Sequence, residues 1–216
     1  MRTIRTRIIP IPVKTWFPSN NPVAVVMARL CVLREDLYLE LKGMIDKPIA
    51  ALDECSSQSR EIYFFRNSVR TLLEIRSAVE TLKQKKSFML ALTKQPYPLN
   101  GAVNKLAKAL NEAHGIVKKL RNEVAGHLPQ KAIEEALHVI DPATRGLLQI
   151  GDTAKEIHYK FIVEILGATM LRHVPYKDAE REWQKILKTT IELSFDALRA
   201  IDRLLASYSR IYKLNV

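Results

Sequence analysis

Residues 120–129 read Leu120-Arg121-Asn122-Glu123-Val124-Ala125-Gly126-His127-Leu128-Pro129 and close a long apolar repeat. The repeat advances by alternating steps of three and four residues, through Val103, Leu106, Leu110, Ala113, Val117, Leu120 and Val124. Such spacing predicts one apolar stripe on a helix that begins near Asn100 and lasts about seven turns. Gly126 and Pro129 indicate where this helix ends, because Gly favours a C-cap and Pro cannot continue the hydrogen-bond ladder. Arg121 and Asn122 are therefore expected in its last turns, with His127 at its end.

A guanidinium, an amide and an imidazole placed where a buried helix opens to solvent resemble a functional site. A structural explanation is equally available, because an Arg near a helix C-terminus interacts favourably with the helix dipole. A His that follows a Gly is also an ordinary loop residue. On a straight helix, Arg121 and His127 point about 120° apart. They converge only if the helix unwinds at Gly126 or if a second copy of the chain supplies the partner.

This motif resembles the signature of the HEPN superfamily, in which an Arg is followed by four to six residues and a His. Five residues intervene here, and Asn122 occupies the place of the polar residue that often follows the Arg in that family. The motif match covers 120–127, and a compatible helical pattern covers 21–140. The resemblance implies an all-helical fold. It also implies either a metal-independent ribonuclease of toxin–antitoxin, phage-defence or RNA-processing type, or a binding module without activity.

In that family the motif residues meet across a homodimer interface, so a homodimer is expected. His127 suits general acid–base catalysis because an imidazole titrates near neutral pH. Arg121 suits stabilisation of charge on the phosphoryl oxygens, and Asn122 would orient His127 or the substrate. The lysines expected to bind nucleic acid are Lys105, Lys108, Lys118 and Lys119.

No cofactor or metal is expected from the sequence. Glu134 and His138 stand four residues apart on one predicted helix, but no third ligand lies near them in the sequence. The lack of a zinc or magnesium cluster fits metal-independent cleavage through the 2′-hydroxyl of RNA, and it fits the absence of catalysis equally well. Members controlled by a nucleotidyltransferase antitoxin often carry a Tyr two residues after the His. Pro129 at that position argues against this form of control.

The net charge of +11 is concentrated near the motif. Residues 83–131 hold ten basic and two acidic side chains, and residues 1–14 add four more basic ones. A polyanion is the natural partner of such a distribution, and RNA is the expected one. The alternative is a lysine-rich face that only interacts with water.

Length and composition indicate a helix-rich folded chain of one domain, with 47% apolar residues and only 7 glycines. Cys31 and Cys55 form no Cys-x-x-Cys pair, and reduced, packed thiols are expected for both. No run of about 18 apolar residues is present, which argues against a membrane span. The expected location is the cytoplasm.

The expected organisation is an extended arm over 1–20, a HEPN-like bundle over 21–140, and a segment over 141–216 that completes the same domain. Asn20 or Asn21 is expected to cap the first helix, which has Pro22 in its first turn and reaches Gly43, and a short helix is expected within 50–57. The next long helix is expected to begin near Ser59, and its core face contains Ile62, Phe65, Val69, Leu72, Ile75 or Arg76, Val79 and Leu82. An amphipathic helix is expected over 131–140.

Residues 146–164 fit both a strand and a helix, because their apolar residues satisfy either period. A small β-hairpin near 147–158 is expected, followed by a helix over about 160–172. The last helix is predicted over about 178–212. Its near-heptad stripe suits bundle packing or dimerisation and contains Trp183, Leu187, Ile191, Leu198, Ile201, Leu205, Tyr208 and Tyr212.

Three functions are therefore considered: a homodimeric metal-independent endoribonuclease, a catalytically silent HEPN-like binding module, and a structural bundle. The third would use its last helix to pair with a protein partner. An antitoxin or another protein remains a candidate partner for the first two.

Overall fold

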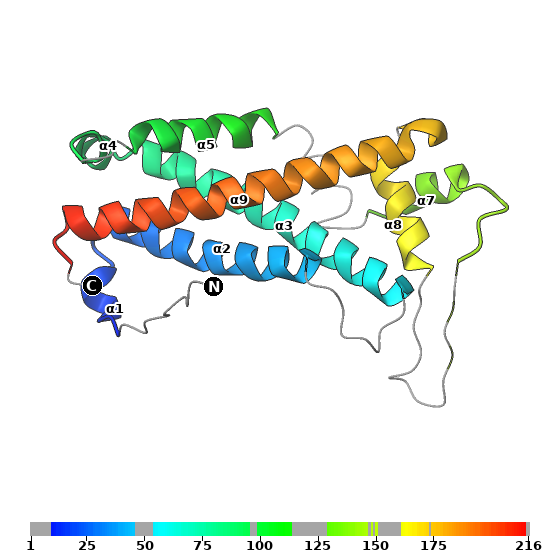
Figure 1. The fold of residues 1–216 in the computed structure, drawn as a ribbon, viewed down its shortest axis with the longest axis horizontal. Helices are drawn as coiled ribbons and strands as arrows, with labels where there is room; N and C mark the ends of the chain where they lie inside the picture. Colours follow the sequence, from blue (N-terminus) through cyan, green and yellow to red (C-terminus); the bar gives the residue numbers. More distant parts are fainter. Residues whose placement is uncertain are drawn as a thin grey trace, which may run out of the picture.

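The computed structural model describes residues 10–45, 54–95, 99–113, 129–146, 148, 150, 161–172 and 174–214 of the chain. Every regular element in these ranges is a helix, which confirms the all-α prediction (Figure 1). The β-hairpin predicted near 147–158 lies outside the described residues, apart from Leu148 and Ile150. Among the described helices, none is both long enough and apolar enough to cross a membrane.

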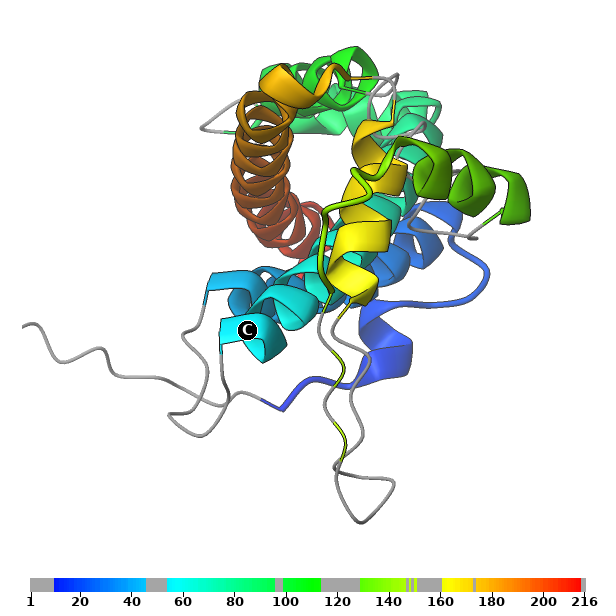
Figure 2. The same ribbon diagram turned by 90° about the vertical axis from the view of Figure 1, so that its right-hand side faces the viewer.

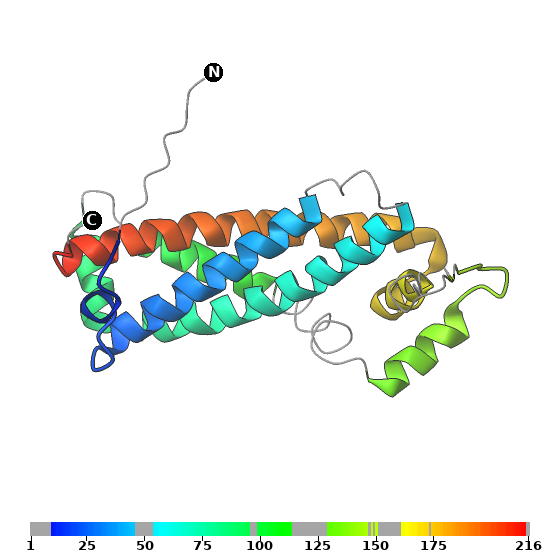
Figure 3. The same ribbon diagram turned by 90° about the horizontal axis from the view of Figure 1, so that it is seen from below.

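Three long helices form the body of the molecule: α2 (Pro22–Ile45), α3 (Glu54–Lys83) and α9 (Ala179–Ile211). Figure 3 shows α2 and α3 side by side, with α9 behind them. The apolar faces of the three helices meet in one core. Arg34 on α2 and Asp202 on α9 form an ion pair across their contact, with Nε and Oδ1 2.9 Å apart.

The start of α2 confirms the predicted cap. The side-chain oxygen of Asn21 accepts the backbone N–H of Val23 at 2.9 Å and of Ala24 at 3.3 Å. These bonds satisfy two N–H groups that the first helical turn leaves unpaired. Pro22 is the first helical residue, where its missing N–H has no cost.

The apolar stripe predicted for α3 is buried, with Ile75 rather than Arg76 at the ambiguous position. The predicted start was wrong, because α3 already begins at Glu54 and includes 54–57, where a separate short helix was expected. A further helix, α4 (Lys86–Thr93), has no counterpart among the predicted elements. It buries Phe88 and Leu92 against the core.

The helix predicted from Asn100 over seven turns was wrong in length. Helix α5 begins at Asn100 but ends at Glu112, and Ala113 is its C-cap. The apolar spacing could not show this end, because residues on both sides of a helix break can keep the same period. The remaining predicted stripe, from Val117 onward, lies outside the described residues.

The predicted helices of the last third of the chain are confirmed. They are α7 (Gln130–Val139), α8 (Ile162–Leu171) and α9, which the 3-10 turn η3 (Tyr176–Asp178) precedes. Figure 2 looks along the bundle and shows α7 and α8 at its near end. These two helices pack on each other, and α8 also contacts α3 and α9.

The extended arm predicted over 1–20 was wrong for part of its length. Within 10–20, residues Val13–Trp16 form the short helix α1. Trp16 is buried, and the ring of Phe17 stacks on Tyr208 of α9 with centroids 6.0 Å apart. The Tyr208 hydroxyl donates a hydrogen bond to the carbonyl of Trp16. Burial of these aromatic rings stabilises the folded chain more than exposure of an extended arm to water would.

Candidate nucleic-acid interface

The proposed catalytic residues Arg121, Asn122 and His127 lie within 114–128, outside the described residues, as do Lys118 and Lys119. Their placement therefore stays a prediction. The described chain reaches the N-terminal edge of this segment at Ala113, the C-cap of α5. Helix α5 ends nine residues before Arg121, and α7 begins three residues after His127, so these two helices flank the motif in the sequence.

Helix α5 carries the two described lysines of the predicted binding set. Its apolar residues, Val103, Leu106, Ala107 and Leu110, are buried towards α3 and α9. Lys105 and Lys108 lie on its exposed side, as predicted for a solvent-facing basic surface. Lys108 pairs with Glu112 at 3.7 Å, and both side chains are largely exposed, so the pair is weak.

A groove runs between α5 and α9, and we call it the α5–α9 groove. Its first part encloses about 160 Å³. That part is lined by Ala102, Lys105, Leu106, Ala109, Asp196, Arg199, Ala200 and Arg203. A second part, of about 320 Å³, is lined by Leu99, Arg203, Ala206, Ser207 and Arg210. Arg203 lines both parts, so the groove continues along α9.

The cationic side chains of the groove outnumber its carboxylates. Lys105, Arg199, Arg203 and Arg210 contribute four positive charges, whereas Asp196 contributes one negative charge. Asp196 is paired with Arg199, whose Nη2 donates to Oδ1 at 2.7 Å. Lys105, Arg203 and Arg210 form no ion pair with any residue that the structure describes. These three cationic side chains are therefore available to bind an anion from outside the protein.

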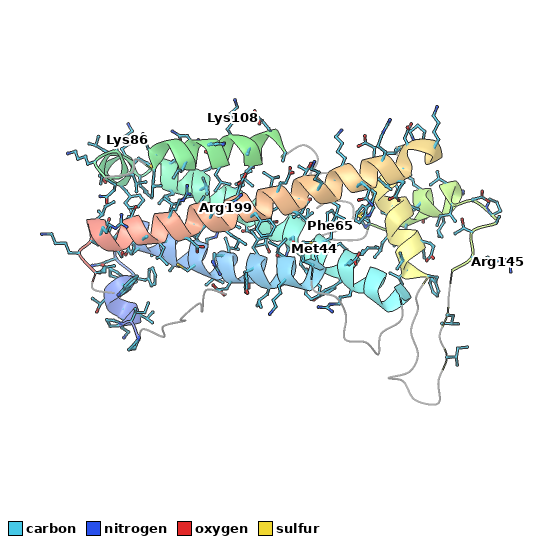
Figure 4. All side chains as sticks on the ribbon, in the orientation of Figure 1. Met44, Phe65, Lys86, Lys108, Arg145 and Arg199 are labelled. Carbon is cyan, nitrogen blue, oxygen red and sulfur yellow. The ribbon has the colours of Figure 1, made fainter. Side chains whose placement is uncertain are left out.

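The arginines share one face of α9 because of their spacing. Arg203 lies four residues after Arg199, and Arg210 lies eleven residues after Arg199. On an α-helix these spacings rotate the two side chains by only about 40° and 20° from Arg199 around the helix axis. These arginines were not predicted from the sequence, because charge was counted along the chain and not around the axis of the last helix. Their four- and eleven-residue spacing was the available signal. Figure 4 labels Arg199 on α9, Lys108 on α5 and Lys86 on α4.

A polar network holds α5 against α3 and so positions one wall of the groove. The Nε of Arg76 donates to the side-chain oxygen of Asn111. The side-chain nitrogen of Asn111 donates to Oε1 of Glu80 at 3.1 Å, and Lys83 lies 3.3 Å from Oε2 of Glu80. This network links three successive turns of α3 to the last turn of α5, just before the motif segment.

The groove has the properties of a phosphate-binding surface. Guanidinium groups match pairs of phosphate oxygens, and three of them line this groove. The described residues contain no group of three or more His, Cys, Asp or Glu side chains able to hold a metal ion. Comparisons with protein-family models, curated proteins and solved structures found no match for this chain.

Proposed function

We propose that this protein binds RNA through the α5–α9 groove and cleaves it, as a homodimer, with the motif residues Arg121, Asn122 and His127. The observation that carries the binding part is the row of Lys105, Arg203 and Arg210, which lack ionic partners among the described residues. Exposed cations that stand close together repel one another, and a polyanion relieves that repulsion while releasing its own counterions.

The groove favours a single-stranded chain over a duplex. Its lining combines four alanines with two leucines and one serine, and three of its four cations lie along α9 rather than across a broad face. A single strand can lay its phosphates along such a row, whereas a duplex needs a wider basic surface.

The cleavage part rests on the chemistry of the motif and its resemblance to HEPN ribonucleases. His127 would move a proton between the 2′-hydroxyl and a leaving oxygen, and Arg121 would bind the phosphoryl oxygens as negative charge develops. Lys118 and Lys119 would hold the backbone beside them. A binding module without catalysis is the competing outcome.

Fluorescence anisotropy with a labelled single-stranded RNA tests the binding part. The double variant Arg203→Gln/Arg210→Gln removes two of the cations that lack an ionic partner among the described residues, so the slope of log K against log salt should fall by about 1.4 in magnitude. The matched control is Arg145→Gln/Lys177→Gln, which removes the same charge from exposed sites away from the groove. Equal affinity and equal salt slope in the two double variants would rule out the groove as the binding surface.

Incubation of the RNA with EDTA present tests the cleavage part. The wild-type protein should cut the RNA, and His127→Ala should reduce the rate at least about 100-fold, the lower end for general acid–base catalysis. RNA binding should survive this substitution. Equal cleavage by the two proteins would remove His127 from the mechanism, and binding without cleavage by either would identify a silent binding module.

A further inference from the structure

The second part of the α5–α9 groove differs from the first in its charge, and we call this part the Ser207 pocket. It encloses about 320 Å³, within the usual range for small-molecule sites. Arg203, Ala206, Ser207 and Arg210 line it from α9, and Leu99 lines it from the start of α5. No carboxylate is among its described lining residues, so the pocket is purely cationic where the first part also holds an ion pair.

Ser207 contributes a hydroxyl group that has no hydrogen-bond partner. The residue is only 2% exposed, and its Oγ bonds to no residue that the structure describes. By contrast, Ser194 and Ser209 of the same helix donate to backbone carbonyls at 2.7 and 2.9 Å. The unpaired oxygens that are fully shielded from solvent among the described residues are Oε2 of Glu40 and Oε2 of Glu164. The Ser207 hydroxyl is therefore still open to solvent, and the open space that Ser207 borders is this pocket.

Ser207 lies between two arginines on one face of α9. Arg203 precedes it by four residues and Arg210 follows it by three, so the three side chains lie within about 60° around the helix axis and about 10 Å along it. Neither guanidinium forms an ion pair with any residue that the structure describes. Because arginine side chains are long, both guanidinium groups can reach one anion that accepts the Ser207 hydroxyl.

The start of α5 adds to the positive potential of the pocket. Leu99 is the N-cap residue of this helix, and its side chain accepts no hydrogen bond from the first turn. A helix N-terminus carries a partial positive charge and favours a nearby anion. Two guanidinium groups, one hydroxyl and one helix end thus surround the same space.

We propose that the Ser207 pocket binds a terminal phosphate of the RNA strand, so that one end of the strand lies here and the strand continues along the rest of the groove. This inference rests on the proposed RNA binding. A phosphate monoester carries about −1.5 to −2 charges at neutral pH and three acceptor oxygens. An internal phosphodiester carries a single charge and has two non-bridging oxygens. Two unpaired guanidinium groups and a free hydroxyl match the monoester better, and both a 5′-phosphate and a 3′-phosphate have this chemistry.

Fluorescence anisotropy with internally labelled single-stranded RNAs of one sequence tests this site. The strands carry a 5′-phosphate, a 3′-phosphate or hydroxyl groups at both ends, and the full-length protein carries His127→Ala so that they stay intact. A hydroxyl-ended strand that is one nucleotide longer contains as many phosphate groups as the phosphorylated strands and controls for charge. One phosphorylated strand should bind at least about tenfold more tightly than this control, and its identity shows which end is bound.

Two negative results have different meanings. Equal binding of the phosphorylated strands and the longer hydroxyl-ended strand would overturn the terminal phosphate site and leave RNA binding in place. Absence of binding to every strand would overturn the proposed RNA binding and this inference with it.

Variants of the pocket test its residues. Ser207→Ala and Arg210→Gln should each reduce the preference for the phosphorylated strand at least about fivefold, and Ser207→Ala should leave affinity for the hydroxyl-ended strand within about twofold. The matched controls are Ser209→Ala, whose hydroxyl bonds within α9, and Lys177→Gln at an exposed site away from the groove. Both controls should keep the full preference. Thermal unfolding establishes that each variant is folded, and full preference in folded Ser207→Ala or folded Arg210→Gln would overturn the inference.

Discussion

Glu40 places a carboxyl group inside the contact between α2 and α3, and it is 8% exposed. Thr71 donates a hydrogen bond to its Oε1 at 2.9 Å, whereas Oε2 has no partner among the described residues. Burial, together with the nearby charge of Asp36, raises the pKa of Glu40 to about 7, although the Thr71 bond and Arg70 act in the opposite direction. This carboxyl group is therefore protonated in the folded protein under mildly acidic conditions.

The raised pKa of Glu40 predicts that stability falls as the pH rises from about 4.5 to about 7. In that window the unfolded chain has released the proton while the folded chain still binds it, so ionisation favours unfolding. Glu40→Gln keeps the acceptor for Thr71 and cannot ionise. Urea unfolding at pH 5 and pH 8 should show that the wild type loses about 1–2 kcal/mol more than the variant over this interval.

The control for this prediction is Glu61→Gln, on the exposed side of α3. Its unfolding free energy should follow the wild type at both pH values. If Glu40→Gln and the wild type lose stability in parallel, the buried carboxyl group does not govern the pH dependence.

At the scale of the element, the close contact of α2 with α3 depends on a residue without a side chain. A Cβ atom added at Gly43 would lie 2.5 Å from the ring of Phe64, at both Cδ2 and Cε2. Phe64 itself is held by Tyr63, with ring centroids 5.3 Å apart, and by the guanidinium of Arg60 over its face. The ring therefore cannot move away freely.

Gly43→Ala should destabilise the protein by up to about 2 kcal/mol. Overpacking costs about 1–3 kcal/mol, whereas Ala gains at most about 1 kcal/mol over Gly inside a helix. Thermal unfolding measures the difference. Gly101→Ala on α5 is the matched control, because nothing lies within 4 Å of the added Cβ atom, and it should be neutral or stabilising. A stabilised Gly43→Ala would show that the two helices separate at little cost.

The helices that carried a local signal were predicted from the sequence. Asn21 and Pro22 marked the start of α2, and the apolar period marked α9 along nearly its whole length. The break between α3 and α4 escaped prediction, because the residues there, Gln84 and Lys85, include neither glycine nor proline. The end of α5 also escaped prediction, because the apolar repeat continues past Ala113 without interruption.

At the scale of the whole molecule, the groove depends on contacts that no local pattern contains. Lys105 and Arg203 come from distant parts of the chain and meet only because α5 packs on α9. The sequence could predict that Lys105 and Lys108 are exposed, but it could not show which helix faces them. The motif residues of 114–128 remain a prediction from resemblance and from the chemistry of their side chains.

The proposed two-chain catalytic site predicts that the protein is a homodimer in solution. Sedimentation velocity should give a species of twice the mass of one chain at micromolar concentration. Because the motif residues would meet across the interface, a mixture of inactive Arg121→Ala and inactive His127→Ala chains should regain part of the cleavage activity. A strictly monomeric protein, or a mixture without any recovery, would contradict a shared site.

The hydrogen bond from Tyr208 to the backbone of Trp16 ties the beginning of the described chain to its last helix. Proteolytic trimming up to Phe17 would uncover the ring of Tyr208, on which Phe17 stacks with centroids 6.0 Å apart. Exposed aromatic surface promotes aggregation. Protein that has been cleaved after Phe17 should therefore aggregate on storage, whereas intact protein from the same preparation should stay in solution.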